Sequence, residues 1–306
     1  MNFYLFIYIV CSYAITILFQ AYSNIPIDYQ IIGSAILLLC IGIPHGTLDH
    51  LITYKVQKTN KLKFYTYYLG TIVLFFLIWM IAPSLGFVLF LLISAFHFGE
   101  TQLHFFFTKS TYISLFIYLN WGVTILFTLL YYNNAELNQM TQLFEDTQVF
   151  LSVYDYDTLK PIFIASNLGS ILSFAYLFYK DKMSSQSLLA ELFFLAVIHL
   201  TSFLFPFIIC FTLFFIVLHS LPSIVHQFTF FKKFKKDFTK KELIQLMAPY
   251  SILSILMSAI LIALSHLNYI PFSIPLISLI VISAITLPHT YVMLNFNNKS
   301  KLTSSK

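Results

Sequence analysis

Ten apolar runs dominate this sequence, and their length limits the folds open to it. Several reach the ~20 residues that a helix needs to cross a bilayer. Of the 306 residues only 9% are charged, whereas a soluble domain carries about 25%. The runs are 3–19, 30–53, 64–82, 84–106, 112–132, 161–179, 187–205, 207–229, 249–267 and 272–294. We therefore expect an all-α, polytopic transmembrane helical bundle of about ten helices, or eight if weak runs merge.

The lysines indicate which side of the membrane each connection occupies. Lysine marks cytoplasmic loops, and the lysines lie after alternate runs, at 55–63, 109, 180–182, 232–241 and 299–306. Lys160 is the one exception. The pattern predicts cytoplasmic N- and C-termini and a multi-pass protein of the cell inner (plasma) membrane. We expect one integral membrane domain, 1–298, followed by a polar C-terminal tail, 299–306.

Three absences narrow the function. The run 3–19 has no basic n-region or A-x-A-like cleavage site, so we expect a retained helix. The cysteines Cys11, Cys40 and Cys210 form no CxxC pair, which favours neither a disulfide framework nor a thiolate metal site. All basic residues are lysines, which argues against bidentate phosphate recognition. The net charge of +5 comes from loop lysines, and we expect no nucleic-acid partner.

Four of the nine histidines fall at a similar predicted depth, on four runs that all pass from outside to inside. These four are His45, His97, His219 and His289. At 1.5 Å per residue, each lies roughly 18–26 Å below the outer surface of a ~30 Å hydrocarbon core. Packed together, these helices can point four imidazoles at one centre. The other mid-span histidines, such as His199 and His266, are expected only to hydrogen-bond to neighbouring helices.

Backbone-breaking residues accompany the first of these histidines. Pro44 precedes His45 and Gly46 follows it. Irregular backbone at membrane depth is tolerated where it lines an enclosed or watery cavity. Asp49 lies one helical turn beyond His45, so it either accepts the N–H of an imidazole whose other nitrogen binds metal or is a helix-end carboxylate. Pro288 before His289 repeats the Pro-His pair.

Glu100 stands in a similar place after His97, and the same kind of alternative applies. It either supports a metal-binding histidine or is a carboxylate at the water interface. Ligation by neutral imidazoles alone suits Fe, Cu, Zn or Ni, and the spacing does not choose among these metals.

The segments that carry these histidines resemble a known family. They are IPHGTLDH (43–50), SAFHFGE (94–100), FFIVLHSLPSIVHQ (214–227) and TLPHTYVM (286–293), and they are similar in order and spacing to the Brp/Blh family of β-carotene 15,15′-dioxygenases. The resemblance covers nearly the whole chain. It implies an integral membrane enzyme with non-haem Fe(2+) that splits β-carotene with O2 into two all-trans-retinal molecules, which serve a microbial rhodopsin.

The resemblance also implies which residues bind the metal and are catalytic, namely His45, His97 and His219. The family places a fourth histidine in an HSxxH element, but this chain has Ser223 at that position. His226, three residues further on, is the first candidate for the fourth ligand, and His289 is the second. A site of three histidines with an open position also suits O2 binding.

The aromatic content agrees with a carotenoid substrate. With 35 Phe and 20 Tyr, the chain can line a slot for a conjugated polyene. Most of these rings are nevertheless expected to contact lipid or neighbouring helices, or to form interfacial belts, as we predict for Tyr65, Tyr67, Tyr68, Tyr131 and Tyr132.

Two other functions compete with carotenoid cleavage. A di-iron desaturase needs HxxxH and HxxHH boxes, which this sequence lacks. The stronger alternative is a non-enzymatic membrane protein that keeps the fold and binds or transports carotenoid or retinal, which Ser223 favours.

Overall fold

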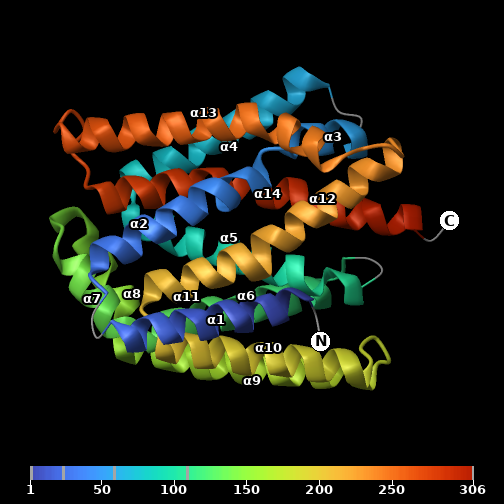
Figure 1. Ribbon diagram of the computed structural model, residues 1–306, viewed down its shortest axis with the longest axis horizontal. Coiled ribbons are helices and arrows are strands. Elements are labelled where there is room, and N and C mark those ends of the chain that lie inside the picture. Colours follow the sequence, from blue (N-terminus) through green and yellow to red (C-terminus); the bar gives the residue numbers. More distant parts are fainter. Residues whose placement is uncertain (1–2, 23–24, 58–59, 108–109, 305–306) are drawn as a thin grey trace. The chain divides into compact units, whose positions relative to one another are not determined.

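The computed structural model describes residues 3–22, 25–57, 60–107 and 110–304, and no strand occurs among them (Figure 1). Within these residues ten helical stretches are long and apolar enough to cross a membrane. Each overlaps one predicted run, and the largest difference is in the ninth, which begins at Lys240 instead of residue 249. The all-α prediction with ten spans is confirmed and indicates a multi-pass membrane protein. Lys58, Lys109 and Lys306, on which the predicted orientation partly depends, lie outside the described residues.

The chain divides into two compact units. Unit 1 contains residues 1–48 and 185–255. Its elements are α1 (Phe3–Ala21), α2 (Ile27–Leu37), η1 (Leu38–Gly42), η2 (Ile43–Gly46), α10 (Ser185–Leu204), α11 (Phe207–Leu213), η5 (Phe214–Ser220), α12 (Leu221–Phe234) and the first part of α13 (Lys240–His266). In Figure 1 the blue α1 runs beside the yellow α10, and a buried hydrogen bond of 2.7 Å joins the hydroxyls of Tyr8 and Thr201.

Two spans of unit 1 contain wide helical turns. The segments η1 and η5 are π-helical, and η1 passes directly into the short 3-10 segment η2. Prolines follow both π-helices, because Pro44 lies in η2 and Pro222 lies in the first turn of α12. Proline has no N–H to continue the regular hydrogen bonding, and π-helical turns inside α-helices often occur at functional sites. The predicted break around Pro44 is therefore confirmed.

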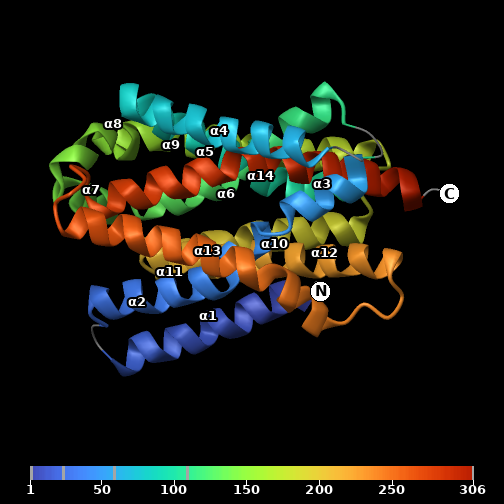
Figure 2. The ribbon, with the colours of Figure 1, turned by 90° about the horizontal axis from the view of Figure 1, so that it is seen from above.

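Unit 2 contains residues 49–184 and 256–306. Its elements are α3 (Asp49–Gln57), α4 (Lys61–Ile81), α5 (Pro83–Leu103), η3 (His104–Phe106), α6 (Tyr112–Tyr132), α7 (Asn134–Gln142), η4 (Glu145–Phe150), α8 (Leu151–Tyr154), α9 (Tyr156–Tyr179), the remainder of α13 and α14 (Ile274–Ser304). Figure 2 shows α14 running along α4 and α5, with α3 beside it. Since α14 continues through Ser304, residues 299–304 of the predicted polar tail prolong this helix.

The helices α5 and α6 cross with their backbones almost touching. A Cβ added to Gly99 would lie 1.8 Å from the Tyr118 carbonyl oxygen, and one added to Gly122 would lie 1.6 Å from the Ala95 carbonyl oxygen. Neither distance can accommodate a side chain, so both positions require glycine. Small residues permit such close approach between membrane helices. The crossing fixes the part of α5 that carries His97.

Polar side chains join α6 to α9 on the other side of α6. Thr124 donates a 2.8 Å hydrogen bond to the Ser166 carbonyl, and Asn120 donates a 2.9 Å bond to the Ser170 hydroxyl. Bonds of this kind hold apolar helices together where the surrounding solvent is lipid. They add rigidity to the helix pair that supports α5.

Candidate metal centre

His45 occupies the short 3-10 segment η2, immediately after the π-helix η1. The side chain is 8% exposed. Its Nδ1 is hydrogen-bonded to the Gly42 carbonyl oxygen. Because a carbonyl can only accept, Nδ1 carries the proton and Nε2 presents its lone pair. The irregular turn thus fixes both the ring orientation and the tautomer of His45.

His219 lies in the π-helix η5 and pairs with His45 inside unit 1. The His219 side chain is buried, and the two ring centroids are 5.1 Å apart with the ring planes at 82°. Phe215 contacts both imidazoles, at centroid distances of 5.4 Å from His45 and 5.3 Å from His219. A Cβ at Gly42 would lie 3.0 Å from the Phe215 ring, so a glycine at this position gives the ring its room.

A second histidine pair lies inside unit 2. His97 on α5 and His289 on α14 are both buried, and their ring centroids are 4.9 Å apart with the planes at 76°. The two rings meet because α14 packs along α5. Each unit therefore holds one edge-to-face pair of buried imidazoles.

Asp49 fixes the orientation of His289. Both carboxylate oxygens accept from Nδ1 of His289, at 2.9 and 3.0 Å, and Asp49 is only 3% exposed. As with His45, the proton on Nδ1 leaves Nε2 with the lone pair. The predicted bond from an imidazole to Asp49 is present, with His289 as the donor. Tyr68 also donates to Asp49, at 3.0 Å, so its assignment to an interfacial belt is corrected.

Glu100 is buried beyond His97 on α5. It is 2% exposed, so its alternative placement at the water interface is wrong. The carboxylate accepts hydrogen bonds of 3.0 and 2.9 Å from Nδ2 of Asn297, a residue of α14 that is 1% exposed. His97 with His289, and Glu100 with Asn297, are thus successive links between the same two helices.

The other candidate residues have other surroundings. Ser223, at the position of the expected fourth histidine, donates a 2.8 Å bond to the His219 carbonyl within the same helical span. His226 is half-buried on α12, and its role as a ligand stays a prediction. His199 is half-buried, and His266 is exposed.

Sequence reasoning missed three residues around the two pairs: Tyr68, Gln227 and Asn297. Asn297 lies eight residues after His289, which is close to two helical turns, so the shared face was a usable signal. The partner of Gln227 is the backbone carbonyl of His45, at 2.7 Å. A helical pattern gives no sign of such a partner.

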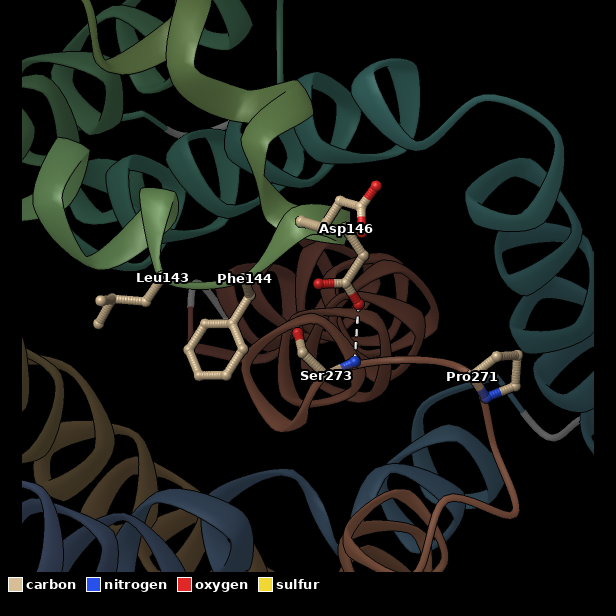
Figure 3. Close-up of a pocket in the computed structure, with 6 residues that line it drawn as sticks. Leu143, Phe144, Asp146, Pro271 and Ser273 are labelled. Carbon is tan, nitrogen blue, oxygen red and sulfur yellow. Dashed lines mark hydrogen bonds between the residues drawn. The ribbon is translucent and has the colours of Figure 1, made fainter.

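Figure 3 shows a pocket of unit 2 at the start of α14. It is lined by Leu143, Phe144, Glu145, Asp146, Pro271 and Ser273. Asp146 accepts a 2.6 Å hydrogen bond from the Ser273 backbone N–H and so anchors the start of α14. His289 lies about 24 Å further along that helix, at 1.5 Å per residue. This pocket is therefore separate from the candidate metal centre.

The imidazoles have the chemistry that a transition metal requires. His45 and His289 each donate through Nδ1 to an oxygen and so present Nε2 as a ligand atom. A carboxylate behind a metal-binding histidine is the usual supporting arrangement, and neutral imidazole suits iron, copper, zinc and nickel. These features define a class: a multi-pass membrane protein with buried imidazole pairs suited to a transition metal.

Comparison with known families identifies the chain more closely. The family model described as beta-carotene 15,15'-dioxygenase matches residues 36–297, which include both histidine pairs, Asp49 and Gln227. The chain belongs to this family. Comparisons with curated proteins and with solved structures each gave no match.

Proposed function

We propose that this protein is a non-haem iron dioxygenase that cleaves β-carotene at its central 15,15′ double bond, giving two molecules of all-trans-retinal. The match of residues 36–297 to the family is the observation that carries the proposal. The buried imidazole pairs agree with it, because a protein that only transports an apolar molecule has no need of them.

The proposed metal ligands are the two pairs together, His45 with His219 and His97 with His289. Chain connectivity supports their convergence on one ion. His45 is four residues from Asp49, so their Cα atoms are at most about 14 Å apart, and Asp49 holds His289. We therefore place His289 ahead of His226 as the fourth ligand.

The protein residues orient groups in this reaction and do not transfer protons. Iron bound to the imidazoles would supply the activation of O2. Both oxygen atoms of O2 join the two carbons of the central double bond, that bond breaks, and two aldehydes form without a net proton transfer. The role of Asp49 is accordingly to keep the proton on Nδ1 of His289 and Nε2 aimed as a ligand. Burial of the imidazoles keeps water away from them.

A row of aromatic rings in unit 1 supports a polyene substrate. Phe207, Phe211 and Phe215 stack one helical turn apart, with centroids separated by 5.8 and 5.6 Å and planes within 17° of parallel. The last ring contacts both His45 and His219. The row offers a flat apolar strip, ending at the histidines, against which an extended conjugated chain can lie.

Expression in a host that makes β-carotene tests the proposal. We expect retinal to accumulate under air and β-carotene to decline, and we expect His45→Ala or His97→Ala to abolish both changes. His199→Ala is the matched control, because this half-buried histidine belongs to neither pair. Persistent β-carotene without retinal, in cells with abundant wild-type protein, would refute the proposed activity.

The competing function is carotenoid or retinal binding without catalysis. Ser223, where the family motif carries a histidine, is the observation that favours it. Iron analysis of the purified protein separates the two functions, since only the dioxygenase requires about one iron per chain.

A further inference from the structure

The backbone of His45 has an unusual hydrogen-bond partner. In a continuous α-helix its carbonyl would accept from the N–H four residues later. Here the 3-10 segment η2 ends at Gly46, and α3 begins afresh at Asp49. A buried carbonyl without a partner is costly at membrane depth. Nε2 of Gln227 donates to the His45 carbonyl oxygen at 2.7 Å.

The hydrogen bond from Gln227 joins two segments of unit 1. Gln227 is 0% exposed and lies on α12, which continues directly from the π-helix that carries His219. The bond therefore ties the backbone of one histidine to the helical span of the other, across 182 residues of sequence. The His45 ring is fixed separately by the Gly42 carbonyl.

We infer that Gln227 is a positioning residue, which holds His45 in register with His219 so that both imidazoles can ligate one metal ion. The inference rests on the proposed metal centre. In this inference, the amide of Gln227 holds a metal-binding histidine in place in unit 1, as the carboxylate of Asp49 does in unit 2. Without the amide, the irregular segment 43–48 loses this hydrogen bond to α12, and the His45 ligand atom shifts relative to that of His219.

Ser223 provides a matched control on the same helix. It is also buried, and it also donates one side-chain hydrogen bond to a backbone carbonyl, that of His219. That bond stays within one helical span, whereas the bond from Gln227 joins two segments. If Gln227 only stabilises its helix locally, Gln227→Met and Ser223→Ala should affect metal binding similarly. If Gln227 positions His45, only Gln227→Met should affect metal binding.

Metal binding by the full-length protein in detergent tests the inference without any assay of activity. Binding of Fe²⁺ is measured anaerobically by equilibrium dialysis, and the absorption spectrum of the Co²⁺-loaded protein reports the ligand geometry. Gln227→Met should weaken Fe²⁺ binding by about tenfold to a hundredfold, the usual effect of replacing a residue that supports a metal ligand. It should also alter the Co²⁺ spectrum. Ser223→Ala should leave both unchanged.

The inference is overturned if Gln227→Met binds and absorbs like the wild type, or if Ser223→Ala changes both properties equally. Should Gln227→Met fail to fold, Gln227→Asn takes its place, since its amide is polar but one methylene too short to reach the carbonyl. A wild-type protein that binds no metal would overturn the centre and the inference together. One that binds metal but leaves β-carotene intact would refute only the proposed reaction.

Discussion

Asp49 and His289 are 240 residues apart in the sequence, yet both oxygens of the Asp49 carboxylate accept from Nδ1 of the His289 ring. The contact brings the start of α3 to the middle of α14. It also selects the imidazole tautomer whose Nε2 can bind metal.

Asp49→Ala should lower iron affinity by about tenfold to a hundredfold and reduce retinal formation, because the His289 ring loses its fixed tautomer and orientation. Iron content after dialysis and retinal yield measure the two effects. Tyr68→Phe is the companion variant. It removes one donor to Asp49 but leaves the bond to His289, so a loss as large as that of Asp49→Ala would argue against the role given to the carboxylate.

The fourth ligand can be assigned by comparing two histidines. His289→Ala should remove bound iron, whereas His226→Ala should retain it at wild-type stoichiometry. Metal analysis of the purified variants decides between them. The opposite result would restore His226, which follows Ser223 on α12, as the ligand.

The aromatic row should affect substrate binding more than turnover. Phe211→Leu removes the central ring and should raise KM for β-carotene by roughly threefold to tenfold, the range set by aromatic contacts of about 0.5–1.5 kcal/mol, with little change in kcat. Phe203→Leu on α10 is the control, since that ring is 72% exposed. Equal KM values for Phe211→Leu and the wild type would show that the row does not contact the substrate.

The crossing of α5 and α6 should tolerate no side chain. Gly99→Ala would force its Cβ against the Tyr118 carbonyl and should destabilise the protein by about 3 kcal/mol, the upper end of typical overpacking costs. Gly70→Ala on α4, where a Cβ would meet nothing within 4 Å, should be neutral or slightly stabilising. Thermal unfolding in detergent compares the two variants.

The sequence predicted the spans well because each is an apolar run long enough to cross a bilayer. It also singles out the four histidines, because few polar residues occur at such depth, and all four side chains are buried. The pairing of His45 with His219 and of His97 with His289 was not predictable, because it depends on which helix faces pack together. The prediction of an irregular backbone at Pro44 succeeded because proline acts locally.

The errors have a similar physical origin. The place of Tyr68 near the end of a span predicts an interfacial belt, but its hydroxyl donates to Asp49 on another helix. For Glu100 the sequence leaves two environments open, beside a metal-binding histidine or at the water interface, and its burial against Asn297 excludes the second. In both cases a partner distant in the sequence decided the environment.

Each histidine pair joins an early helix to a late one, and this constrains biosynthesis. While the ribosome is still making the chain, His45 and His97 are already inserted but their partners are not. His289 lies on α14 and is translated long after His97. In the proposed metal centre, the full set of ligands therefore exists only after α14 has been made, and a product terminated before α14 would retain only the His45–His219 pair.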